Sequence, residues 1–231
     1  MKFKTFINET ALQTGELHYI TSRLNDKRQY FRAKQTPEQI INVLEHLFND
    51  EISFEWRDTI DTSTDPEAIA LGITGARYAG GYVHFEINPN FFKAIKTEAS
   101  WSKFVHILSD YFHHELVHAL QDQRMTPEQR SKEAKSYFKV LSSGKDYEYF
   151  KFPAELMAFS WTVVREFMRS GLNKASIINI LKNPDSPDAS RSPIFMEYKK
   201  HFYKSDRRTW TKFLRYCSEY TNELKDNVAT K

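Results

Sequence analysis

Hydrophobic and polar residues follow two different periods along this chain. Between residues 51 and 90, apolar and polar side chains alternate in Ile52–Trp56 and Tyr82–Ile87, which is the period of a strand with one buried face. From about residue 100 onward, apolar residues recur every three or four positions, as in helices. The pattern predicts strands at 52–56, 82–87 and, less regularly, 73–78, and helices at roughly 37–48, 100–122, 127–141, 153–170, 174–182, 193–204 and 206–224.

Three of the expected helix starts share one local sequence. Thr36-Pro37-Glu38, Asp65-Pro66-Glu67 and Thr126-Pro127-Glu128 each place a side-chain oxygen at the N-cap and proline in the first turn. The oxygen can accept a hydrogen bond from a free backbone N–H group, and proline has no N–H group to leave unpaired. Gln39 and Gln129 complete a capping box in the first and third cases. Helices should therefore begin near residues 37, 66 and 127.

The order of these elements predicts an α+β fold. One helix comes first, a short mixed sheet follows, and the rest of the chain is mostly helical, so that the strands are segregated early in the sequence. A soft boundary is expected near residue 123, between a part with the sheet, residues 1–122, and a helical part, residues 123–231. In strand 82–87, Val83, Phe85 and Ile87 should face the core, and Tyr82, His84 and Glu86 should face the other way.

Charge and aromatic content argue against a nucleic-acid partner. The 33 Lys and Arg residues exceed the 30 Asp and Glu residues by only three, and the charges are interspersed rather than gathered into basic arms. The 18 Phe and 12 Tyr residues are therefore expected to fill cores and line a cleft, not to stack on bases.

The lack of long apolar segments and the single cysteine limit the class of protein further. The N-terminus lacks the apolar run of a signal peptide, and no stretch approaches about 18 continuous apolar residues. No membrane partner is expected, and the chain should stay in the cytoplasm unless another route exports it. The single cysteine, Cys217, excludes an internal disulfide and a cysteine-rich zinc site. Any metal must therefore be held by histidine and carboxylate.

Three of the eight histidines lie within six residues, in H-H-E-L-V-H, His113–His118. On a helix His114 and His118 project from one face a single turn apart, which suits two ligands of one tetrahedral ion. Glu115 is rotated by about 100°, within reach of a water but badly placed to share the metal. His113 points away from the pair and is expected at the surface or behind the ligands. The helix has one face with Val105, Leu108, Phe112, Leu116 and Ala119, and a nearly opposite face with Ile107, Tyr111, His114, His118 and Gln121.

The segment H-E-L-V-H-A-L-Q-D, His114–Asp122, resembles the active-site helix of the zincin metallopeptidases. Metzincins add a glycine and a third histidine, which Ala119, Leu120 and Gln121 do not supply. The resemblance is therefore to the gluzincin branch, whose third ligand is a glutamate on a later helix. It implies a zincin-like fold over roughly residues 37–170 and a Zn²⁺-dependent peptidase acting on peptide or protein substrates. His114 and His118 would be ligands and Glu115 the general base.

Glu155 is the best candidate for the third ligand that the resemblance implies. It follows Pro153 among apolar neighbours, where a buried carboxylate needs a charged partner. Glu133 lies between lysines on a solvated helix, and Glu148 lies in a tyrosine-rich segment. Alternatively, Glu155 is a first-turn acid that interacts with the helix dipole.

The spacing of acidic residues along this helix also suggests side chains that could support the histidine ligands. Asp110 precedes His114 by four residues and Asp122 follows His118 by four. Each could orient a histidine ring through its other nitrogen, or could be an ordinary exposed acid. By resemblance to zincins, strand 82–87 would be the sheet edge that pairs with an extended substrate; a buried middle strand is the alternative.

The sequence offers several candidates for the remaining catalytic role and two further hypotheses for function. Tyr147, Tyr149, Arg165, His201 and Tyr203 are all candidates to stabilise an oxyanion. A zincin-fold protein that binds without cleaving is a second hypothesis. A di-iron carboxylate protein is a third, although it needs a second E-x-x-H motif that the chain lacks. The sequence leaves the substrate, the oligomeric state and regulation open.

Overall fold

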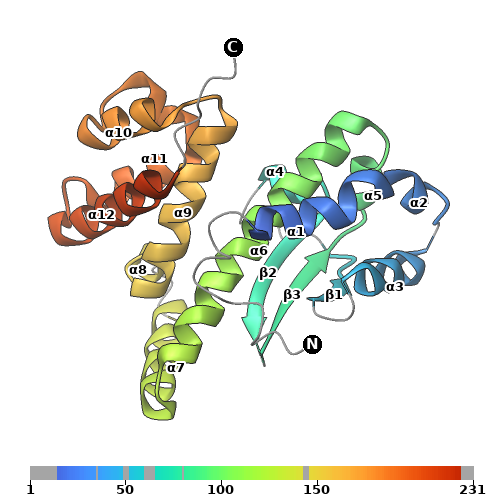
Figure 1. Cartoon of the computed structure of the whole chain (residues 1–231). Helices are drawn as coiled ribbons and strands as arrows, with labels where there is room; N and C mark the ends of the chain where they lie inside the picture. Colours follow the sequence, from blue (N-terminus) through green and yellow to red (C-terminus); the bar gives the residue numbers. More distant parts are fainter. Residues whose placement is uncertain are drawn as a thin grey trace. The chain divides into compact units, whose positions relative to one another are not determined.

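The computed structural model describes residues 15–34, 36–48, 52–59, 66–79, 81–142 and 146–224 (Figure 1). The chain divides into two compact units, Met1–Ala119 and Leu120–Lys231. The division falls inside one long helix, α6 (Glu98–Arg124), whereas the sequence suggested a boundary after residue 122.

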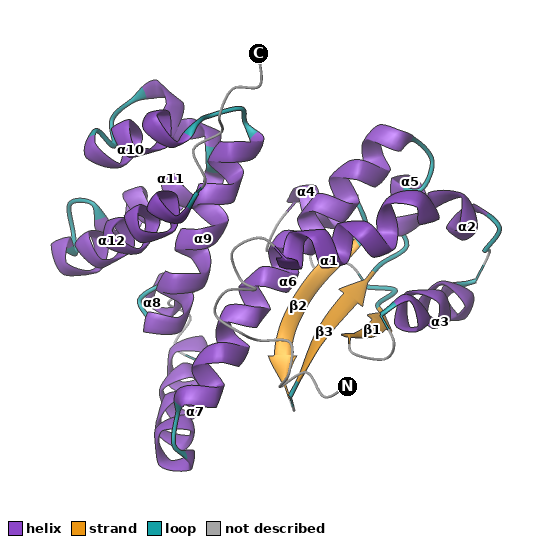
Figure 2. Ribbon diagram, in the orientation of Figure 1, coloured by secondary structure: helices purple, strands orange, loops and turns teal. Residues whose placement is uncertain are grey.

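The first unit contains a three-stranded mixed sheet (Figure 2). Its strands are β1 (Ile52–Trp56), β2 (Ile73–Ala79) and β3 (Tyr82–Ile87), arranged in the order β1-β3-β2. β1 runs parallel to β3, and β2 runs antiparallel to it, with Ala79 opposite Tyr82. The α+β class and the small mixed sheet predicted from the sequence are confirmed.

The prediction that strand 82–87 lies at the sheet edge is wrong. β3 is the central strand, with a partner on each side. Alternation correctly predicted its faces, because Val83, Phe85 and Ile87 are fully buried while the Tyr82 side chain is 51% exposed. Alternation reports that one face is buried and does not report how many strands lie beside it. A substrate that adds a strand to this sheet would have to use β1 or β2.

Helices pack on the buried face of the sheet. They are α1 (Gly15–Leu24), α2 (Arg28–Arg32), α3 (Pro37–Leu47), α4 (Pro66–Ala70), α5 (Phe91–Ala94) and α6, with a short 3₁₀ turn at Asn25–Lys27. Leu24 of α1, Leu44 of α3 and Leu108 of α6 join Val83 and Phe85 in one continuous core. The sequence pattern predicted α3, α4 and α6 but not α1, α2 or α5.

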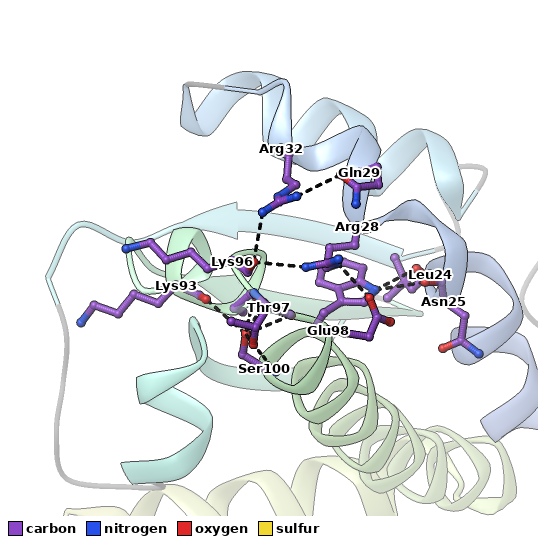
Figure 3. A network of polar contacts seen from close by, with 12 residues as sticks. Leu24, Asn25, Arg28, Gln29, Arg32, Lys93, Lys96, Thr97, Glu98 and Ser100 are labelled. Atoms are coloured by element: carbon purple, nitrogen blue, oxygen red, sulfur yellow. Dashed lines mark hydrogen bonds and ion pairs between the residues drawn. The ribbon is translucent and has the colours of Figure 1, made fainter.

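Polar contacts fix the beginning of α6 against the preceding helices (Figure 3). The Arg28 guanidinium forms an ion pair with Glu98 at 3.0 Å. Arg28 and Arg32 both donate to the backbone carbonyl of Lys96, each at 3.2 Å. The Trp101 indole N–H donates to the last carbonyl of α1 at 3.2 Å. These bonds hold the position and rotation of the helix that carries the histidine cluster.

The second unit is helical. Its elements after α6 are α7 (Pro127–Leu141), α8 (Asp146–Tyr149), α9 (Pro153–Arg169), α10 (Lys174–Lys182), a 3₁₀ turn at Pro187–Arg191, α11 (Pro193–Phe202) and α12 (Arg207–Glu223). Its core is rich in aromatic rings, and Tyr198 stacks on Phe213 with ring centroids 4.0 Å apart. Among the described residues, no helix is long and apolar enough to cross a membrane.

The predicted helix starts are found where the structure describes them. Thr36 accepts a hydrogen bond from the Gln39 backbone N–H at 3.3 Å. Thr126 and Gln129 form both bonds of a capping box, at 3.3 and 2.8 Å. α4 begins at Pro66 as expected, although its predicted cap, Asp65, lies outside the described residues.

Candidate metal centre

The structure brings His114, Glu115 and His118 together on α6. One ligand atom from each lies within 4.8 Å of the other two, so the three side chains form a group that could hold a metal ion. The two imidazole ring centroids are 4.9 Å apart, with ring planes inclined at 68°. His114 is 9% exposed and Glu115 is 6% exposed, while His118 is half-buried. The cluster predicted from residue spacing is therefore present as a compact, mostly buried site.

The two-faced character of α6 positions this cluster. On one face, Val105, Leu108, Phe112 and Leu116 are buried in the core of the first unit. Ile107, Tyr111 and His118 on the other face are only partly buried. Because the apolar face anchors the helix, the histidine face is held in one orientation, as the helical period predicted.

The donor set suits a first-row transition metal. Two imidazoles and a carboxylate are the ligands that Zn²⁺ and its neighbours take in proteins. Metal–ligand bonds of about 2.0–2.2 Å in a tetrahedron separate ligand atoms by roughly 3.4 Å. The ligand atoms of His114, Glu115 and His118 are no more than 4.8 Å apart, so modest rotations would bring the two imidazoles to an ion with the Glu115 carboxylate beside it.

His113 is buried, at 3% exposure, so the expectation of a surface position is wrong. It lies one residue after Phe112 and three before Leu116, both of which are core residues. His113 therefore lies at the border of the apolar face of α6, where its side chain is buried. A position behind the predicted ligands, the other expectation for His113, is compatible with this burial.

Asp110 and Asp122 have different environments. Asp122 forms an ion pair with Arg130 at 2.9 Å, and its side chain is 40% exposed. Its backbone carbonyl also accepts two hydrogen bonds from Arg130, so Asp122 joins α6 to α7. Asp110 is 4% exposed and is therefore not an ordinary exposed helix acid. It is the better candidate to orient a metal-bound histidine.

Glu155 lies in the second unit, in the first turn of α9. Its side chain is 3% exposed, so the predicted burial is confirmed. Phe152 at the N-cap makes no side-chain capping bond. Tyr149 is hydrogen-bonded to the Glu155 carboxylate, and burial, reinforced by the charge of Glu155, raises the pKa of Tyr149 well above its ordinary value. The place of Glu155 among the metal ligands stays a prediction.

The other residues singled out from the sequence have partners within the second unit. Glu148 pairs with Lys151 at 2.9 Å. His201 lies 2.6 Å from a Glu197 carboxylate oxygen and stacks on Tyr147, with ring centroids 5.5 Å apart. Arg165 lies 5.3 Å above the Trp161 ring, and burial lowers the pKa of its guanidinium. Glu133 is half-buried on α7, and Tyr203 lies 6.0 Å from the guanidinium of Arg207.

Tyr137 was not predicted from the sequence. It is hydrogen-bonded to Tyr149, and the two rings pack edge to face with centroids 5.4 Å apart. These tyrosines lie twelve positions apart in the sequence, and no spacing rule links positions on two different helices.

No family model, curated protein or solved structure matches this chain. Of the residues that the structure describes, only His114, Glu115 and His118 form a group of three or more His, Cys, Asp or Glu side chains with metal-binding spacing.

Proposed function

We propose that this chain is a zinc-dependent peptidase with a zincin-like fold. In this proposal His114, His118 and Glu155 hold the ion and Glu115 is the general base. The observation that carries the proposal is the grouping of His114, Glu115 and His118 within 4.8 Å on a largely buried turn of α6. Three protein ligands leave the fourth position of a tetrahedral site open, as in catalytic zinc sites.

The proposed chemistry divides between the ion and Glu115. Bound Zn²⁺ would activate a water molecule and polarise the carbonyl of the scissile peptide bond. Glu115 would take a proton from the attacking water and deliver it to the leaving nitrogen. Its position directly after His114 supports this role, because its carboxylate lies beside both imidazoles but leaves the helix in a different direction.

Two alternatives have different consequences. A zincin-fold binding protein would hold metal but cleave nothing, so peptide turnover separates it from the peptidase. A di-iron protein would carry two ions in a carboxylate-rich helical site. The second cluster that it requires is absent from the described residues, which favours the single-ion proposal.

Metal content tests the ligand set. Wild-type protein should bind about one zinc per chain, and His114→Ala and His118→Ala should lose it because each removes a ligand. His106→Ala is the matched control, because His106 lies two turns before His114 on α6 and its ring contacts Ser102 at 3.4 Å. It should keep its zinc. Zinc retained by His114→Ala would contradict the proposal.

The same assay tests the third ligand. Glu155→Ala should bind zinc less tightly than wild type, whereas Glu133→Ala should match it. The reverse result would show that Glu133 is the ligand.

A further inference from the structure

We infer that Tyr149 is a positioning residue that holds the Glu155 carboxylate in the orientation needed for metal binding. The inference rests on the proposed function, since it concerns the proposed third ligand. Tyr137 lies on α7, Tyr149 is the last residue of α8, and Glu155 lies in the first turn of α9. Three consecutive helices of the second unit therefore bring two hydroxyls and a carboxylate together.

The hydrogen bond between Tyr149 and Glu155 has a defined direction. Tyr149 is bonded to both Glu155 and Tyr137. An ionised carboxylate can only accept a hydrogen bond, and a tyrosine hydroxyl has a single proton. An ionised Glu155 therefore accepts from Tyr149, and Tyr137 is bonded to the same Tyr149 hydroxyl.

Neighbouring rings hold Tyr149 in place. Its ring packs edge to face with Tyr137 at 5.4 Å, with Phe150 at 5.7 Å and with Phe159 at 6.2 Å between centroids. Tyr137 in turn contacts Phe152 at 5.8 Å. Aromatic contacts of this kind restrict both side-chain torsions of a tyrosine. The hydroxyl therefore points at the carboxylate from a fixed position.

The backbone between donor and acceptor is also constrained. The Phe152 N–H donates to the Tyr149 carbonyl at 3.1 Å, which closes a turn after α8. Pro153 then begins α9 with a fixed backbone torsion. The Leu156 N–H donates to the Phe152 carbonyl at 2.9 Å, so the first turn that carries Glu155 is formed. The separation between Tyr149 and Glu155 is thus set by hydrogen-bonded structure.

This arrangement has a consequence for metal binding. A carboxylate has two oxygens, so one can accept from Tyr149 while the other ligates an ion. Fixing one oxygen fixes the plane of the group and the direction of the other oxygen. Partners that orient a ligand in this way typically change metal affinity by about 10–100-fold.

Zinc affinity, measured by competition with a chromophoric chelator, tests the inference without reference to activity. Tyr149→Phe removes the donor and keeps the ring, so zinc should bind about 10–100-fold more weakly. Tyr137→Phe should cause a smaller loss, since the direct bond to Glu155 remains. Tyr220→Phe is the matched control: Tyr220 is a half-buried tyrosine on α12 of the same unit, and zinc affinity should not change.

A double-mutant cycle separates positioning from simple stabilisation. If Tyr149 acts through Glu155, adding Tyr149→Phe to Glu155→Ala should weaken zinc binding no further. Equal losses in both backgrounds would overturn the inference, as would wild-type affinity in Tyr149→Phe. Should Tyr149→Phe not fold, the same cycle is run with Tyr149→Met, which also removes the donor but packs flexibly among the neighbouring rings, and equal losses in both backgrounds would overturn the inference.

The outcomes also distinguish this inference from the proposed function. Tight zinc binding that needs His114 and His118 but is unchanged in Glu155→Ala would overturn the role of Tyr149 and leave the histidine site standing. A wild-type protein that binds no zinc would overturn both.

Discussion

At the scale of single residues, some features of the candidate centre follow from the spacing of residues along a helix, and others depend on tertiary packing. His114 and His118 meet because residues four apart share a helix face, so the sequence alone predicted them. Asp110 and Asp122 have equivalent spacing to a histidine, yet one is buried and the other pairs with Arg130. That difference depends on what packs against each position, which spacing cannot report.

Asp110 provides the prediction at this scale. Asp110→Asn should weaken zinc binding by about 10–100-fold, because a buried carboxylate one turn before His114 is placed to hold its ring and increase its basicity. Chelator competition measures the effect. Asp122→Asn, which alters only the contact with Arg130, is the control and should bind zinc as the wild type does. Equal affinities in all three proteins would show that Asp110 is not involved.

At the scale of elements, strong local signals were sufficient for most helices. Thr-Pro starts predicted α3 and α7, and a regular apolar period predicted α9, which begins at Pro153 as expected. α5 and α8 have four residues each, too few to show a period. The place of β3 in the sheet depends on β1 and β2, which pair with it through contacts that are not local in sequence.

One junction between elements is set by a glycine. Gly72 connects α4 to β2 with φ of 98°, and an added Cβ would lie 2.3 Å from the backbone nitrogen of Phe91. Gly72→Ala should therefore destabilise the protein by about 3 kcal/mol or more, the sum of left-handed strain and a clash with backbone. Gly81→Ala is the control, because its φ is 89° and a Cβ would meet nothing within 4 Å. It should lose only about 1–2 kcal/mol. Urea unfolding measures both, and equal losses would contradict the clash.

The start of α12 should respond to acid. Asp206 accepts a hydrogen bond from the Thr209 backbone N–H at 3.1 Å, and this bond, helped by Thr209 Oγ1 and Lys151, lowers the pKa of Asp206. A carboxyl with a lowered pKa contributes stability above its unfolded pKa of about 3.9 and loses it as the pH falls through the folded value. Asp206→Asn keeps an acceptor but cannot titrate. The stability advantage of wild type over Asp206→Asn should therefore shrink from about pH 5 downward. Urea unfolding at several pH values measures this difference; a constant difference would contradict the role of the charge.

At the scale of the whole molecule, the sequence predicted an early sheet and a helical remainder, and the structure has both. The division into units falls inside α6, where a continuous helical pattern gives no local mark of a boundary. Glu155, the proposed third ligand, lies on a later helix than His114 and His118. The histidines could be assigned from one helix, whereas the assignment of Glu155 required the resemblance and the apolar character of its surroundings.

The central claim is that the cluster on α6 is a catalytic metal centre, and Glu115→Gln tests it most directly. Glutamine keeps the size and polarity of the side chain but cannot take the proton of the attacking water. Bound zinc should therefore equal that of the wild type, while cleavage of peptides from a denatured proteome should fall by about 10⁴-fold or more, at or above the upper end for loss of a general base. Zinc content and turnover are measured on the same preparations of both proteins. Equal turnover in wild type and Glu115→Gln would contradict the proposed mechanism, and zinc-loaded wild type without any turnover would favour a binding protein.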